Sequence, residues 1–181
     1  MLESYLQVAE VMFMQVRLKA FIIFCVYTCA KFLVKRKCEF KPFKMLCEFG
    51  WILTVLLILK ITGITTGDFG TTSVFDGNVQ ISFNISIENF SIATLLNLIL
   101  FIPFGFFSAG VLKKLRSKWI YGILIGLIFS LTVEFLQTFI GRFVELEDVL
   151  MNTMGAFIGY EIMVLVIKLK DRMKMGALKV E

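Results

Sequence analysis

Long apolar segments alternate with short polar connections along the chain. Segments of roughly 18 or more nearly uncharged residues are long enough to cross the hydrocarbon core of a bilayer as α-helices. We place five spans at residues 20–34, 45–64, 93–112, 119–140 and 148–167. The pattern predicts an all-α integral membrane protein with five transmembrane helices.

The amino-terminal segment has a different pattern. In residues 1–16, Glu3 and Glu10 are spread among apolar side chains, which predicts an amphipathic helix at the membrane interface or an extension of the first span. The apolar run that follows closes on basic residues 35–37 without a small-residue cleavage site, so we expect it to stay in the mature chain. Lys31 is close enough to the end of this span to extend toward the lipid head groups.

The connection from residue 63 to residue 92 is long and contains a strand-like pattern. Apolar and polar residues alternate with a period of two, which is typical of a half-buried strand. The apolar members are Val79, Ile81, Phe83, Ile85 and Ile87. Asp76-Gly77 precedes them as a turn signal. We expect a short β-like segment over one end of the helices.

The distribution of basic residues predicts the orientation of the helices in the membrane. Lysine and arginine cluster in residues 35–44, 113–118 and 168–179, whereas 63–92 has none and 141–147 has only Arg142. Basic connections normally face the cytoplasm, so we expect the amino terminus outside and the carboxyl terminus inside, against the weaker opposing signal of Arg17 and Lys19. The corresponding division is a lead-in, first span and basic loop at 1–45, a transmembrane domain at 46–167 and a basic tail at 168–181.

Composition agrees with a lipid environment and excludes several kinds of chemistry. Of the residues, 58% are hydrophobic and 18% charged, and the net charge of +5 lies in short clusters, so we expect no nucleic-acid partner. The chain has no histidine, and its four cysteines lack the usual spacing of a zinc site. We therefore expect no metal and no cofactor.

Three spans each carry polar or small residues along one helix face. Spacings of three and four residues place such a set on a single narrow face, and small residues let a second helix approach closely. The sets are Asn97, Phe101, Phe104 and Ser108; Gly122, Gly126, Ser130, Glu134 and Gln137; and Asp148, Asn152, Gly155 and Gly159. Within the third span, Pro103 predicts a kink and Gly105 adds local tolerance.

The polar members lie at similar depths, in the outer leaflet of the predicted topology. Glu134 is about 9 Å inside the outer end of its helix, and Asn97 and Asn152 are each about 6 Å inside theirs. A carboxylate at this depth is costly and is usually paired or functional, and Lys60 is a candidate counter-ion for Glu134. Structural hydrogen bonding between helices is the alternative for Asn97 and Gln137.

The short connection between the last two spans adds further charged candidates. They are Arg142, Glu145, Glu147 and Asp148, which either join the polar cluster or form a solvated turn with Asp148 as a helix cap. A connection of this length makes the fourth and fifth helices antiparallel neighbours. We expect Asn97, Glu134, Gln137, Asp148 and Asn152 around one pocket that opens outward beside Arg142.

These segments resemble the VanZ-like family. The resemblance covers residues 80–165 and rests on three blocks in order: 97–105, 130–137 and 142–155. By position, the motif residues are Asn97, Pro103, Gly105, Glu134, Gln137, Arg142, Asp148, Asn152 and Gly155. Glu145 and Glu147 stand where the family usually has aspartates, and 84–86 matches its Asn-Leu-x-Pro-Phe element only loosely. The resemblance implies a bacterial plasma-membrane protein of the cell envelope, whose named member lowers susceptibility to the glycopeptide teicoplanin.

Three functions fit this pattern. The first is action at the outer leaflet on envelope lipids or their precursors, with glycopeptide tolerance as the readout. The second is a non-catalytic helper that packs against a partner membrane protein through Gly122, Gly126 and Ser130. The third is an enzyme that uses Glu134 or Asp148 as general acid or base. The expected partners are membrane lipids, with a cell-wall lipid precursor, a glycopeptide or a membrane protein as further candidates.

Overall fold

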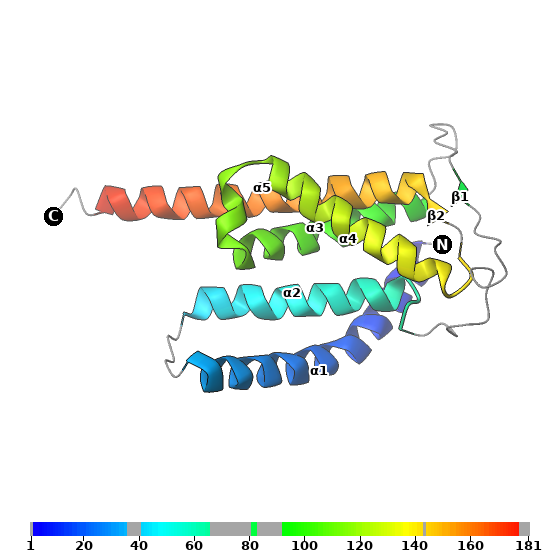
Figure 1. Ribbon diagram of the computed structural model, residues 1–181, viewed down its shortest axis with the longest axis horizontal. Helices are drawn as coiled ribbons and strands as arrows, with labels where there is room; N and C mark the ends of the chain where they lie inside the picture. The colour runs from blue at the N-terminus through cyan, green and yellow to red at the C-terminus, as the bar shows by residue number, and fades with distance from the viewer. Residues whose placement is uncertain (1, 36–40, 66–80, 83–91, 143, 178–181) are drawn as a thin grey trace.

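The computed structural model describes residues 2–35, 41–65, 81–82, 92–142 and 144–177, and it is almost entirely helical (Figure 1). The main elements are α1 (Leu2–Lys35), α2 (Pro42–Ile61), α3 (Ile92–Val111), α4 (Ile120–Thr138) and α5 (Leu146–Ala177). A 3-10 helix, η2 (Lys113–Ser117), joins α3 to α4. Two residues each form β1 (Ile81–Ser82) and β2 (Val144–Glu145).

All five α-helices are long and apolar enough to cross a membrane, which confirms the five predicted spans. Their outward surfaces are strongly apolar; Leu33, Phe135 and Leu165, for example, are all more than half exposed. Exposed apolar surface on this scale is unfavourable in water and suits a lipid environment. The direction in which the helices cross the bilayer stays a prediction.

Two helices extend beyond the predicted spans. The lead-in and the first span form one continuous helix, α1, so the segment before residue 17 extends the first span instead of forming a separate interfacial helix. At the other end of the chain, α5 continues past residue 167 as far as Ala177. Part of the basic tail is therefore helical, and α5 projects beyond the other helices (Figure 1).

Helices α3 and α5 approach each other so closely that their backbones are in contact. A Cβ atom on Gly105 would overlap the carbonyl oxygen of Ala156. A Cβ on Gly155 or Gly159 would overlap the carbonyl oxygens of Leu98 or Ile102, respectively. Since membrane helices gain little from the hydrophobic effect, close packing through small residues is a main source of their association. The pairing of α3 with α5 is thus the tightest contact in the bundle.

The remaining helices pack around this pair. Helix α4 lies against α5, α2 against α3, and α1 against α2 (Figure 1). Gly126 of α4 faces Ala156, and Gly122 faces the ring of Tyr160, so the small-residue face of α4 serves contact with α5. Between α3 and α4, the ring of Phe104 stacks on that of Phe129 with centroids 4.2 Å apart.

An ion pair joins α1 to α2 within the apolar part of the bundle. Lys31 Nζ lies 2.7 Å from Glu48 Oε1, and Lys44 Nζ lies 3.7 Å from the same oxygen. Glu48 is only 5% exposed. The sequence-based expectation that Lys31 extends toward the head groups stays a prediction; the structure adds that its ammonium pairs with a buried carboxylate on the neighbouring helix.

Candidate functional site

A polar pocket lies at the end of the bundle where α4 ends and α5 begins. Its volume is about 260 Å³. The lining residues are Glu134, Gln137, Gly141, Arg142, Glu145 and Asp148. Four of these, Glu134, Gln137, Arg142 and Asp148, were singled out from the sequence as ligand-binding candidates.

The turn after α4 brings these residues back over the helix end. Gly141 has φ = 78°, a left-handed conformation that glycine adopts without steric cost. The amide of Arg142 then donates to the carbonyl oxygen of Gln137 at 3.1 Å. The chain therefore reverses within a few residues, and α5 starts beside the end of α4 as its neighbour.

The end of α2 forms part of the same site through its backbone. Gln137 Nε2 and Arg142 Nη1 both donate to the carbonyl oxygen of Thr62, each at 3.2 Å. Gly63 follows with φ = 83°, which turns the chain away from the helix. Sequence analysis missed Thr62, because a backbone carbonyl contributes no side-chain signal.

Glu134 is the most deeply buried carboxylate of the pocket, with 4% of its surface exposed. Its Oε2 accepts a hydrogen bond from the backbone amide of Glu145 at 3.3 Å. Arg142 attracts it electrostatically, whereas Asp148 and Glu145 repel it. In the described part of the chain no ion pair joins Glu134 to Lys60, so the proposed counter-ion is wrong and Arg142 supplies the nearby positive charge.

Strand β2 holds Glu145 in place above Glu134. Residues Val144 and Glu145 pair in parallel with Ile81 and Ser82 of β1. Two residues of the predicted alternating segment thus contribute to the edge of the site. The remainder of that segment lies outside the described residues.

Asp148 connects the pocket to α3. It lies in the first turn of α5, where the helix dipole favours a negative charge. The side chain of Asn97 in α3 is hydrogen-bonded to its carboxylate. Asn97 therefore supports a residue that lines the pocket, although it is not itself among the lining residues.

Asn152 lies one helical turn deeper than Asp148. Its Nδ2 donates to Ser130 Oγ of α4 at 3.0 Å, and only 3% of Asn152 is exposed. The expectation that all five polar residues surround one pocket is thus wrong for Asn97 and Asn152, neither of which lines it. The Oδ1 of Asn152 is buried and accepts no hydrogen bond from the described residues. A ligand-binding role for Asn152 stays a prediction.

The glycines and the proline of the motif lie within helices α3 and α5 and do not line the pocket. Gly105 and Gly155 allow the backbone contact between α3 and α5 that brings Asn97 to Asp148. Pro103 lies within α3, which is continuous from Ile92 to Val111. Ser108, on the same α3 face, accepts a hydrogen bond from Trp51 Nε1 at 3.0 Å and so links α3 to α2.

The pocket offers many hydrogen-bond acceptors and one permanent cation. Carboxylates come from Glu134, Glu145 and Asp148, and the guanidinium comes from Arg142. Among the described residues no three histidine, cysteine or acidic side chains are arranged to hold a metal ion. The arrangement is suited to hydrogen bonding and charge recognition of a polar group.

Comparison with known proteins identifies the family. Residues 21–168 match the model of the VanZ/LLP1 family, a region that begins in α1 and ends in the last third of α5. No curated protein and no solved structure matches the chain. The family match includes every residue that lines the pocket and most of the chain. The protein therefore belongs to the VanZ/LLP1 family.

Proposed function

We propose that this VanZ/LLP1 protein binds the polar head of a cell-envelope lipid, or of a lipid-linked precursor, at the outer leaflet of the bacterial plasma membrane. Tolerance of glycopeptide antibiotics such as teicoplanin is the proposed cellular consequence. The observation that carries the proposal is the pocket formed by Glu134, Gln137, Arg142 and Asp148 at one end of five membrane-spanning helices.

Burial of Glu134 is the first argument for a binding role. A carboxylate among apolar helices costs several kcal/mol, and such residues in membrane proteins usually serve a function. Among the described residues, the backbone amide of Glu145 donates the one hydrogen bond to this carboxylate, which compensates only part of that cost. The acceptor capacity that remains at Glu134 is available to a ligand carrying hydrogen-bond donors or positive charge.

Access to the pocket is the second argument. Gly141, Arg142 and Glu145 are exposed, whereas Glu134 and Gln137 form the buried floor. A polar head can therefore enter from the membrane surface while its acyl chains stay in the bilayer. The carbonyl of Thr62 holds Gln137 and Arg142 in place, so the floor is organised before a ligand arrives.

The two rival functions have less support. A helper that recruits a partner through Gly122, Gly126 and Ser130 lacks that surface, because α5 already covers it. An enzyme using Glu134 or Asp148 as general acid or base would have to act on a bound water, because the residues that line the pocket include no serine, threonine or cysteine nucleophile. We therefore favour binding over catalysis.

Native mass spectrometry of protein purified with its own lipids tests the proposal. We expect a lipid or lipid-linked precursor to remain bound to the wild type and to be lost from Glu134→Gln. Thr132→Val is the matched control, since Thr132 is exposed on the same helix and, within the described part of the chain, its hydroxyl bonds only to the carbonyl of Ile128. Equal retention by Glu134→Gln and wild type would contradict the proposal.

A further inference from the structure

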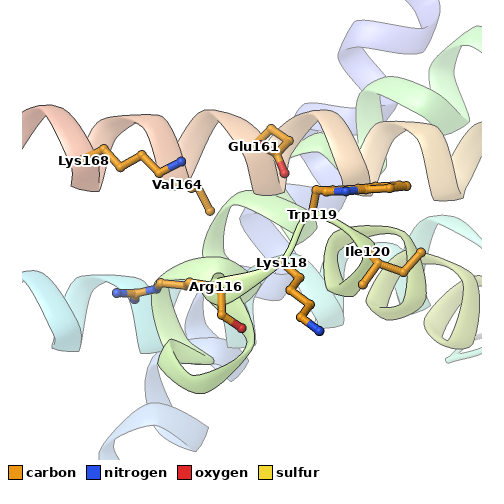
Figure 2. Close-up of a pocket in the computed structure, with 8 residues that line it drawn as sticks. Arg116, Lys118, Trp119, Ile120, Glu161, Val164 and Lys168 are labelled. Atoms are coloured by element: carbon orange, nitrogen blue, oxygen red, sulfur yellow. The ribbon is translucent and has the colours of Figure 1, made fainter.

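A second and larger pocket lies at the opposite end of α4, outside the candidate site. Its volume is about 580 Å³, within the range of small-molecule sites. The lining residues are Arg116, Ser117, Lys118, Trp119, Ile120, Glu161, Val164 and Lys168. Figure 2 shows the α5 side chains Glu161, Val164 and Lys168 on one side and the segment bearing Arg116, Lys118 and Trp119 on the other.

The wall formed by η2 is held in position at both ends. Arg116 donates from Nε and Nη2 to the carbonyl oxygens of Ala109 and Gly110, at 2.5 and 2.6 Å, and so caps the end of α3. Tyr160 of α5, which is 1% exposed, directs its hydroxyl at the carbonyl oxygens of Leu115 and Lys118. These contacts fix the backbone that carries Lys118, so the pocket is preformed.

Positive charge dominates the pocket. Three cations, Arg116, Lys118 and Lys168, line it together with one carboxylate, Glu161. The guanidinium of Arg116 is already engaged with backbone carbonyls, whereas no described residue forms an ion pair with Lys118 or Lys168. The two ammonium groups are available to an anion. Among the described residues, Glu161 forms no ion pair.

The same pocket is partly apolar and lies at the membrane boundary. Trp119, Ile120 and Val164 line it, and Ile120 is the first residue of a membrane span. Trp119 is 61% exposed, and exposed tryptophan at a span end is typical of the head-group region. Cations beside an apolar wall at this depth match a phospholipid, whose phosphate and acyl chains are joined at the same boundary.

We propose that this pocket binds the head group of an anionic phospholipid that carries hydroxyl groups, as phosphatidylglycerol does. Lys168 holds the phosphate from α5, and Lys118, whose ammonium points away from α5 in Figure 2, turns toward it on its flexible four-carbon stem. Such point charges are the usual basis of anionic-lipid recognition by basic pockets between membrane helices. Glu161 and Ser117 accept hydrogen bonds from the head-group hydroxyls. The negative charge of Glu161 disfavours a doubly charged phosphate monoester. In the predicted topology this lipid belongs to the cytoplasmic leaflet.

Fluorescence quenching of Trp119 in bilayers tests the assignment. The chain has two tryptophans, so Trp51→Phe leaves Trp119 as the sole reporter. With lipids brominated on their acyl chains, we expect phosphatidylglycerol to quench Trp119 at lower mole fraction than phosphatidylcholine. The expected preference is about fivefold for each lysine that contacts the phosphate. Equal quenching by the two lipids would overturn the proposal.

Charge-matched variants separate a pocket from a general surface attraction. Lys118→Gln with Lys168→Gln should abolish the preference. Lys113→Gln with Lys114→Gln removes the same amount of charge from η2, which directly precedes Lys118, yet these lysines are not among the lining residues, so the preference should persist. Equal losses in the two double variants would show surface attraction and contradict a defined site.

Three further measurements complete the test. Phosphatidic acid, a monoester without head-group hydroxyls, should bind more weakly than phosphatidylglycerol in the wild type, and Glu161→Gln should remove that difference. Soluble glycerol phosphate at millimolar concentration should leave the quenching unchanged; displacement would show a phosphate site that does not require a lipid. Trp51 donates a hydrogen bond to Ser108, so Trp51→Phe removes one contact of the bundle. Native mass spectrometry of the unmodified protein avoids this substitution and should show retained phosphatidylglycerol. Absence of the lipid there would also contradict the proposal.

Discussion

Asn152 of α5 and Ser130 of α4 form a buried hydrogen bond, with Nδ2 and Oγ 3.0 Å apart. The bond lies one turn below Asp148 and Glu134, the carboxylates that these two helices contribute to the polar pocket. It therefore fixes the relative positions of α4 and α5 directly beneath the candidate site.

Removing this bond should weaken the bundle modestly. In a double-mutant cycle of Asn152→Leu and Ser130→Ala, we expect a coupling free energy of about 0.6 kcal/mol, the average for polar contacts between membrane helices. Thermal unfolding in detergent, followed by circular dichroism, measures the four proteins. Additive effects of the two substitutions would show that the contact contributes nothing to stability.

Contact between α3 and α5 should tolerate no side chain at its centre. Gly155→Leu would drive a side chain into the carbonyl of Leu98, so we expect a loss of roughly 3 kcal/mol or more and poor recovery of folded protein. Met154→Leu, at the exposed neighbouring position, is the control and should behave as wild type. Normal thermal stability of Gly155→Leu would contradict the observed packing.

Removing one partner of the ion pair between Lys31 and Glu48 should cost more stability than removing both partners. Lys31→Met leaves Glu48 with the Tyr27 hydroxyl and the more distant Lys44. We expect a loss below the roughly 3–5 kcal/mol typical of a fully buried pair, because Lys31 is partly exposed. The double variant Lys31→Met with Glu48→Met should be more stable than Lys31→Met alone. Unfolding temperatures of the three variants provide the comparison, and the opposite order would rule out this account.

The predicted orientation can be tested independently of the pocket. A reporter active only in the cytoplasm should function when fused after Glu181 and stay silent when inserted near Gly70. This expectation follows from the basic residues that flank α1, α3 and α5 and from their absence in residues 63–92. The reverse pattern would place the polar pocket at the inner leaflet.

Much of the architecture could be predicted from the sequence, because apolar length and helix-face spacing are local properties. The five spans, the buried faces bearing Ser130 and Glu134, and the adjacency of α4 and α5 all follow from such patterns. The length of α1 was ambiguous, since an amphipathic lead-in and an extended span have similar composition. Helix propensity alone does not separate them.

Contacts between distant segments were the part that sequence patterns could not determine. The glycines of α5 gave no sign that their partner is α3, because the contact is with backbone carbonyls that every residue possesses. The carbonyl of Thr62 and the pairing of Lys31 with Glu48 were missed for the same reason: side-chain spacing within one helix does not specify the neighbouring helix. Depth alone suggested Lys60 as the partner of Glu134, whereas the chain reversal at Gly141 brings Arg142 there instead.

Glutamate 134 is the residue on which the proposed function depends most. Its substitution by glutamine keeps the side-chain volume and removes the charge. If the carboxylate were only part of the packing, losing a costly buried charge would be neutral or stabilising. We therefore expect Glu134→Gln to remain folded while it loses activity.

The most direct test is teicoplanin susceptibility of cells that produce wild type, Glu134→Gln or Thr132→Val at equal abundance in the membrane. The account predicts that wild type and Thr132→Val raise tolerance, and that Glu134→Gln loses it while remaining folded. Wild-type tolerance in cells producing Glu134→Gln, or no tolerance from the wild-type protein itself, would contradict the proposed role of the pocket.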